Sequence, residues 1–156
     1  MKVKDFVLKK REEEKGPRDF HISDYTHNKF LSPISEELKK FSVEGREIIL
    51  FAILLSAKKR KLDSGKSNFS HKIKEEREGP PKAVISIIEL DSEKIEFLLS
   101  IMIYLFGVES IFNYKEMIKT LEELAEEGLD ILYNKFTNDY LNSPSKFADE
   151  IFNGKL

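Results

Sequence analysis

The stretch EGREIILFAILLSAKKRK, residues 44–61, places the strongest constraint on how this chain folds. Ile48, Phe51 and Leu55 are separated by three and four positions, which is the spacing of one helical face. A helix that is apolar nearly all round needs neighbours on most of its sides, so we predict a central helix over residues 43–61. Four more apolar side chains occupy its other faces: Ile49, Leu50, Ile53 and Leu54.

The ends of this predicted helix carry residues that suit a helix dipole. Ser42 is expected to act as the N-cap, and Glu44 and Glu47 lie near the positive end. The last turn, Lys58-Lys-Arg-Lys, brings cations to the negative end.

Capping residues and apolar spacing predict two further helices. Asp91 is a good N-cap for a helix over residues 92–106, and a second pattern runs from Tyr114 to Phe136. Gly128 lies on the apolar seam of the second helix, which indicates that a neighbouring backbone comes close there. The inner face of the first helix is predicted to be Ile95, Leu98, Leu99, Met102 and Phe106, and the seam of the second Met117, Leu121, Leu124, Gly128 and Ile131.

The remaining segments give weaker signals. A helical pattern begins at Val3 and stops at Gly16-Pro17, a short helix is expected to start at Ser35, and residues 19–33 are expected to be irregular or extended. Residues 83–88 fit either a short buried strand or the start of a helix. The predicted fold is therefore one all-α, compact multi-helix domain with room for one short strand near 83–90. We expect a less regular N-terminal arm over residues 1–40 and a polar basic loop over 62–82.

Composition restricts the protein's class and compartment. The 156 residues suit a single domain, and the absence of cysteine excludes disulfides, thiolate zinc sites and cysteine nucleophiles. No signal peptide is visible, and the apolar runs are too short or interrupted to span a bilayer, so we expect a cytoplasmic protein with no membrane partner. The lack of glutamine and tryptophan beside abundant Lys, Glu and Ile is typical of thermophile proteins.

No motif indicates a reaction. Gly65-Lys66-Ser67 ends like a phosphate-binding loop, but Arg60 stands where that signature needs its first glycine. The three-residue spacing of His21, Asp24 and His27 could suit a metal, although the surrounding residues show no convincing helix and surface or capping roles are favoured. We therefore expect a protein that is not an enzyme, with no metal and no cofactor.

Charge is strongly polarised along the chain, and it supplies the candidate site. Residues 58–77 hold eight Lys or Arg against three acids, and residues 89–130 hold eleven acids against three bases. The basic cluster is a candidate contact for nucleic acid or a partner, or else a solvated helix end and loop. The acidic cluster is a solvated face or a face for a basic partner, which the basic turn of the same fold could provide. The basic candidates are Lys58, Lys59, Arg60, Lys61, Lys66, Lys72, Lys74 and Arg77, and the acidic ones are Glu122, Glu123, Glu126, Glu127 and Asp130.

Two stretches together resemble a known family. Residues 44–61, quoted above, resemble a helix with a basic last turn in the small DNA phosphorothioation-associated (Dnd system-associated) accessory proteins. IKTLEELAEEGLDILYNKF, residues 118–136, is similar to the closing helix of that family. The likeness covers about residues 40–136, and it departs from the family at Leu55-Ser56, where a Gly-Tyr or similar pair is usual.

The resemblance implies an accessory role beside prokaryotic DNA modification or restriction, as part of a defence system and without an assigned catalytic activity. The basic turn would then contact DNA or modification and restriction proteins. Two alternatives remain open from the residues alone. One is a helical subunit of another nucleoprotein assembly, and the other is a homo-oligomeric interaction module whose acidic helix docks on another copy's basic turn.

Overall fold

The computed structural model describes residues 2–62 and 81–153. The described chain is mostly helical with one two-stranded sheet, which confirms the predicted fold class. The main helices are α1 (Val3–Glu14), α3 (Ser32–Leu38), α4 (Gly45–Leu62), α6 (Ser92–Phe106), α7 (Tyr114–Lys135) and α8 (Pro144–Phe152). The strands are β1 (Asp19–Ile22) and β2 (Lys82–Ser86). The shorter helical pieces are α2 (Asp24–Thr26), η1 (His27–Leu31), η2 (Lys39–Phe41), η3 (Ile87–Glu89), η4 (Val108–Ile111) and η5 (Phe136–Tyr140).

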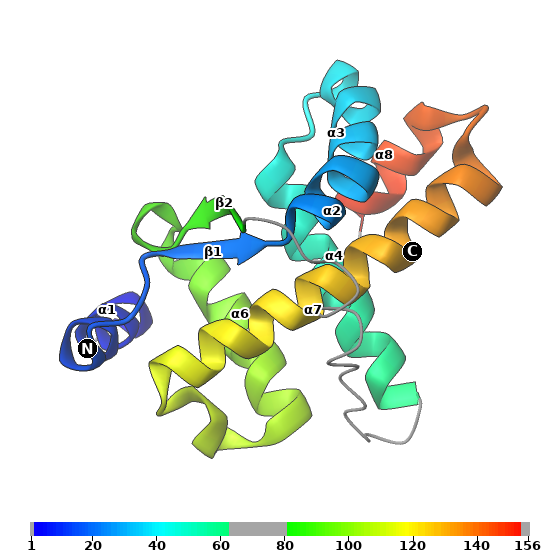
Figure 1. Cartoon of the computed structure of the whole chain (residues 1–156). Helices are drawn as coiled ribbons and strands as arrows, with labels where there is room; N and C mark the ends of the chain where they lie inside the picture. Colours follow the sequence, from blue (N-terminus) through cyan, green and yellow to red (C-terminus); the bar gives the residue numbers. More distant parts are fainter. Residues whose placement is uncertain (1, 63–80, 154–156) are drawn as a thin grey trace.

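Helices α4 and α7 cross at the centre of the molecule, and the other elements pack around them (Figure 1). The crossing is close because Gly128 has no side chain. A Cβ at Gly128 would lie 1.8 Å from the carbonyl oxygen of Ala52 and 2.4 Å from its carbonyl carbon. The sequence-based expectation of a close backbone at Gly128 is therefore confirmed, and the backbone belongs to α4.

The three predicted long helices are found close to their predicted limits. Asp91 caps α6 by accepting a hydrogen bond from Lys94 N at 2.9 Å, and bonds from Lys94 hold the pKa of Asp91 below its usual value. Asn113 Oδ1 caps α7 by accepting from Glu116 N at 3.1 Å. The inner faces are buried except at two positions: the side chain of Phe106 is 38% exposed at the end of α6, and Ile131 on α7 is only partly buried.

The start of α4 differs from the sequence-based prediction. Ser42 is not the N-cap, because it adopts a left-handed conformation with φ 62° and ends the turn η2. The helix begins at Gly45, and Glu44 N donates to Glu47 Oε1 at 3.2 Å. The side chain of Glu47 thus satisfies a backbone donor that precedes the helix, which is half of a capping box.

The N-terminal forty residues are more regular than the sequence indicates. Residues 19–33 form strand β1 and a helical run that continues into α3. Strand β1 pairs antiparallel with β2, with Asp19 opposite Ser86 and Ile22 opposite Lys82. The alternatives for residues 83–88 are thereby resolved as a strand that ends at Ser86, followed by the turn η3. The polar loop predicted over 62–82 falls almost entirely outside the described residues.

Helix α1 is tied to the start of α7. Glu14 accepts hydrogen bonds from Tyr114 N at 2.6 Å and Lys115 N at 3.2 Å, so a carboxylate from α1 meets the positive end of α7. The ring of Tyr114 is fully buried against Gly16, and its hydroxyl donates to Pro17 O at 2.6 Å.

Burial of Tyr114 predicts a loss of stability at alkaline pH. Burial raises the pKa of Tyr114 from 10.0 to about 12 in the folded protein. The neutral hydroxyl therefore stabilises the fold below pH 10, and that contribution is lost as the pH rises toward 12. We expect the free energy of unfolding, measured with urea across this range, to fall with pH, and to fall less steeply in Tyr114→Phe.

A residual slope should remain in that variant because of Tyr140. The pKa of Tyr140 is raised to about 12 as well. The largest cause is the hydrogen bond from its hydroxyl to Glu150, and the next is burial. Equal slopes in the wild type and in Tyr114→Phe would contradict the assignment to Tyr114.

Among the described residues, no helix combines the length and apolar character needed to cross a membrane.

Candidate interaction surface

Part of the predicted basic cluster lies at the C-terminal end of α4. The four basic residues there differ in how exposed their side chains are. Lys58, Lys59 and Lys61 are exposed, whereas Arg60 is only 4% exposed. The other predicted basic residues lie outside the described residues: Lys66, Lys72, Lys74 and Arg77.

Arg60 binds an acidic residue of the same chain. Its Nε and Nη2 atoms donate to Glu127 Oε2 at 3.1 and 2.7 Å, and Lys59 Nζ lies 3.9 Å from Glu127 Oε1. The sequence predicts Arg60 as one of the contact residues for nucleic acid or a partner, but its side chain is buried and binds Glu127 instead. The guanidinium joins α4 to α7 next to the helix crossing, because Glu127 is the residue that precedes Gly128.

Most of the acidic residues of α7 make contacts within the fold. They therefore do not form a simple solvated face. Glu126 is 5% exposed and accepts from Ser23 N at 2.5 Å, from Ser23 Oγ at 3.2 Å and from the hydroxyl of Thr26. Glu122 accepts from His21 N at 2.6 Å. Both carboxylates thus fix β1 and the turn after it onto α7.

The two remaining acidic positions lie nearer the surface. Asp130 Oδ1 accepts from Asn134 Nδ2 at 3.1 Å, and Glu123 is partly exposed. The sharper sequence-based alternative, in which the basic turn of this same fold is the partner of the acidic helix, agrees with the Arg60–Glu127 contact.

The buried carboxylate of Glu126 predicts a measurable loss on neutral substitution. A glutamine at this position keeps the volume but offers one oxygen instead of two, and its amide nitrogen cannot accept from Thr26. We expect Glu126→Gln to lower the free energy of unfolding by about 2 kcal/mol in urea melts, because a buried donor loses its acceptor.

Glu123→Gln is the matched control for Glu126→Gln. Glu123 stands one turn earlier on α7 and is partly exposed, so its change should stay within about 0.5 kcal/mol. Equal losses in the two variants would contradict the role given to Glu126.

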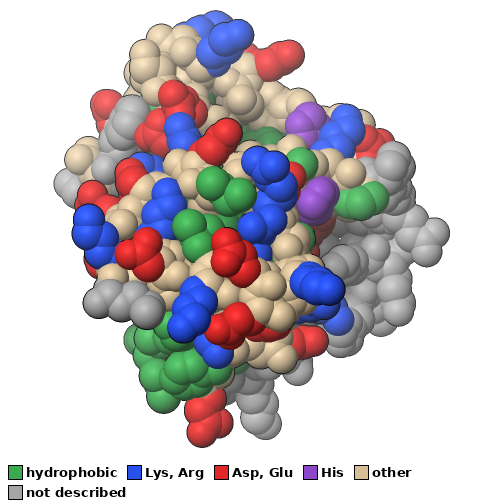
Figure 2. Space-filling model, turned by 90° about the vertical axis from the view of Figure 1, so that its left-hand side faces the viewer, with side chains coloured by type: hydrophobic (Ala, Val, Ile, Leu, Met, Phe, Trp, Pro, Cys, Tyr) green, Lys and Arg blue, Asp and Glu red, His purple; other side chains and the backbone are tan. Residues whose placement is uncertain are grey.

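One exposed aromatic side chain adjoins a lysine at the end of α4. Lys61 Nζ lies 4.6 Å from the ring centroid of Tyr104, which is 57% exposed on α6. In Figure 2, hydrophobic side chains gather at the lower edge of the molecule, where the connection between α6 and α7 lies in Figure 1. We give the name α4–α6 surface to the exposed lysines at the end of α4 together with the exposed apolar residues at the end of α6 and in the turn after it. Its members are Lys58, Lys59, Lys61, Ile103, Tyr104, Phe106, Val108 and Phe112.

The apolar half of this surface is not predicted by the sequence pattern. Phe106 continues the apolar period of α6, so the pattern assigned it to the core. The glycine after Phe106 is the signal that could have corrected this. Gly107 has φ 89° and ends the helix, so Phe106 is the last residue of α6. Val108 and Phe112 then lie in a turn, where they are 56% and 50% exposed, although the ring of Phe6 on α1 packs edge-on against Phe112.

The histidines do not form a metal site with their neighbours. His21 Nδ1 lies 3.6 Å from Glu122 Oε2, and His27 Nδ1 lies 3.1 Å from Asn28 Oδ1. Asp24 pairs instead with Lys82 Nζ at 3.0 Å. Within residues 2–62 and 81–153, no three His, Cys, Asp or Glu side chains are grouped closely enough to hold a metal ion.

Comparison with known proteins adds no relative to this picture. No protein-family model matches the chain, and neither a curated protein nor a solved structure matches it. The α4–α6 surface is therefore interpreted from its own chemistry.

Proposed function

We propose that this chain is a non-enzymatic accessory protein of a prokaryotic DNA phosphorothioation modification or restriction system, and that it contacts DNA or a partner protein of that system through the α4–α6 surface. The observation that carries the proposal is the position of the Lys61 ammonium over the exposed ring of Tyr104. The resemblance of residues 44–61 and 118–136 to that family supports the choice of system.

The α4–α6 surface combines two kinds of contact. Lysines on the last turns of a helix bind phosphate oxygens and gain affinity from the counterions that they release. An exposed aromatic ring beside a cation offers a face on which a base can stack, or an anchor for a protein partner. Arg60 is left out of this contact, because its bond to Glu127 keeps it in the interior.

A salt titration tests the contact with DNA. Filter binding of duplex DNA would be measured at rising salt for the wild type and for a variant with Lys58, Lys59 and Lys61 changed to Ala. We expect at least tenfold weaker binding in the variant, and a slope of log K against log salt that is flatter by up to about 3.

The control variant removes charge at the other end of α4. Lys39 and Lys40 are exposed on η2, just before α4, whereas Lys61 lies near the far end of this helix, whose 18 residues span roughly 27 Å. Changing both to Ala should leave the affinity and the salt slope nearly unchanged. Equal losses in the two variants would show that the α4–α6 surface has no special part in DNA binding.

The assignment to a phosphorothioation system has a separate test. Genes for sulfur modification or restriction are expected beside the gene for this chain, and a neighbourhood without them in several genomes would argue against the assignment.

A further inference from the structure

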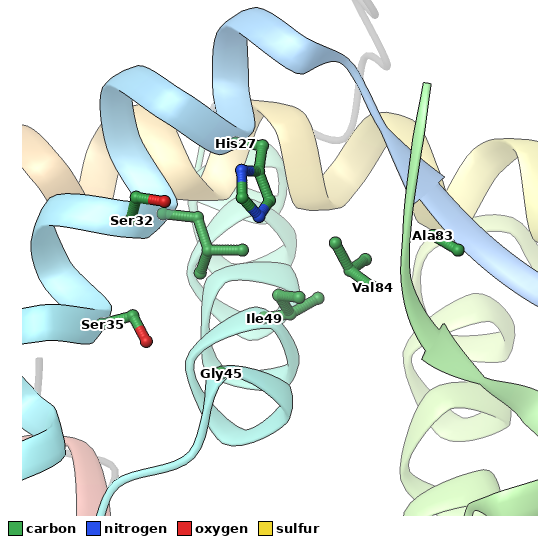
Figure 3. Close-up of a pocket in the computed structure, with 8 residues that line it drawn as sticks. His27, Ser32, Ser35, Gly45, Ile49, Ala83 and Val84 are labelled. Carbon is green, nitrogen blue, oxygen red and sulfur yellow. The ribbon is translucent and has the colours of Figure 1, made fainter. Parts of the chain in front are cut away.

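A hollow lies at the N-terminal end of α4, at the opposite end of that helix from the α4–α6 surface (Figure 3). Its volume is about 260 Å³. One wall is the helical run of η1 and α3, the first turns of α4 form the floor, and β2 forms the other wall. We call it the α3–β2 pocket.

An irregularity of the sheet turns one side chain toward this pocket. The register pairs Phe20 with Ile85 and His21 with Ala83, so Val84 has no partner on β1. A bulge of this kind re-aims the side chain of the extra residue. In Figure 3, Val84 extends from β2 toward the space beside Ile49.

The opposite wall supplies hydrogen-bonding groups. His27, Ser32 and Ser35 come from one continuous helical run, and in Figure 3 the ring of His27 points into the space between that run and β2. Within the part of the chain that the structure describes, neither the Ser32 nor the Ser35 hydroxyl makes a hydrogen bond. Such hydroxyls on a helix normally bond to a preceding carbonyl or to water.

The lining is polar and apolar in nearly equal parts, so it offers apolar surface together with a few hydrogen-bonding groups, the two elements that small-molecule sites combine. Leu31, Ile49 and Val84 provide apolar surface, and the eight lining residues include no Asp, Glu, Lys or Arg. A pocket without an ionic partner disfavours a charged ligand, because the charge would lose water without compensation. Hydroxyls can both donate and accept, and an imidazole offers a further ring nitrogen, so this wall suits a hydroxyl or carbonyl group.

We propose that the α3–β2 pocket binds a small uncharged molecule, with an aromatic or branched apolar body against Val84, Ile49 and Leu31 and one hydroxyl or carbonyl group toward Ser32, Ser35 and His27. The volume agrees with this size, because an apolar cavity of about 150 Å³ holds benzene and 260 Å³ leaves room for substituents. This site is separate from the proposed DNA contact and does not depend on it.

Nuclear magnetic resonance of the full-length chain can test the pocket with simple probes. The probes are p-cresol, which has a ring and a hydroxyl, toluene, which lacks the hydroxyl, and benzoate, which is charged. We expect p-cresol to shift the amide signals of Leu31, Ile49 and Val84 saturably in the millimolar range. Toluene and benzoate should bind about tenfold more weakly. Toluene has no hydroxyl to bond with the polar wall, and the charge of benzoate has no ionic partner in the lining.

Two variants separate the pocket from non-specific adsorption. Gly45 lines the pocket, and a Cβ built there meets nothing within 4 Å, so Gly45→Leu starts its side chain in open space and should abolish the shifts by occupying the pocket. The double variant Ser32→Ala and Ser35→Ala should weaken p-cresol to the level of toluene and leave toluene unchanged. Ser100→Ala on the exposed side of α6 is the matched control and should bind as the wild type does.

The proposal is overturned by any of three results. These are no saturable shift with p-cresol, equal shifts in a folded Gly45→Leu variant, or binding of benzoate as tight as that of p-cresol.

Discussion

Arg60→Ala should lower the free energy of unfolding by about 3–5 kcal/mol, the range seen when one member of a buried ion pair is removed. Glu127 would keep its charge in a site where its side chain is only 16% exposed, after losing two donors from one guanidinium. Lys59 lies 3.9 Å from the other carboxylate oxygen and is too exposed to replace those bonds.

Urea unfolding followed by circular dichroism would measure this loss, and Lys59→Ala is the matched control. Both variants remove one cation from the same basic turn, yet Lys59→Ala should cost no more than about 0.5 kcal/mol. The double variant Arg60→Ala and Glu127→Ala should cost less than the two single losses added together, because it leaves no buried charge behind. Equal losses for Arg60→Ala and Lys59→Ala would mean that the Arg60–Glu127 contact does not support the fold.

A single methyl group at Gly128 is the second change with a large expected effect. In Gly128→Ala the new carbon would overlap the backbone carbonyl of Ala52, and backbone cannot rotate away as a flexible side chain can. Helices α4 and α7 would have to separate along the line where they hold the core together. We expect a loss of about 3 kcal/mol, near the upper end for overpacked cores.

Gly45→Ala gives a control with the same chemical change. The Cβ at Gly45 meets open space, and alanine is the better helix former, so this variant should be unchanged or more stable by up to about 1 kcal/mol. Thermal melts of both variants would make the comparison. A melting temperature for Gly128→Ala equal to that of the wild type would contradict the close crossing.

The long helices could be predicted from the sequence because their signals are local. Asp91 is an N-cap next to a long apolar period, and the structure begins α6 at Ser92. Strand β1 could not be predicted in this way. Its partner β2 is about sixty residues away, and the side chain that fixes the following turn is Glu126, about a hundred residues away. Because both partners are distant in the sequence, the residues around β1 give no local pattern that indicates them.

The candidate site was predicted less well, because four consecutive cations look equivalent in the sequence. Helical spacing does not separate them either, because α4 is buried on most of its sides. Ile53 and Ser56 lead to Arg60 at intervals of three and four, but Ala52 and Leu55 lead to Lys59 at the same intervals, and all four of these preceding residues are buried. Arg60 differs because its partner Glu127 lies 67 residues away on α7, where local spacing gives no information about it.

The pairing of β1 with β2, and the hold of Glu126 on Ser23, have a consequence for how the chain is made in the cell. Residues 19–26 leave the ribosome long before the residues that secure them. At about 5–20 residues per second, roughly 5–20 s pass before residue 126 has been synthesised. During this interval Phe20 and Ile22, which end up fully covered, have no partners to bury them. The nascent N-terminal segment is thus a natural client for a chaperone that shields apolar side chains until translation is nearly complete.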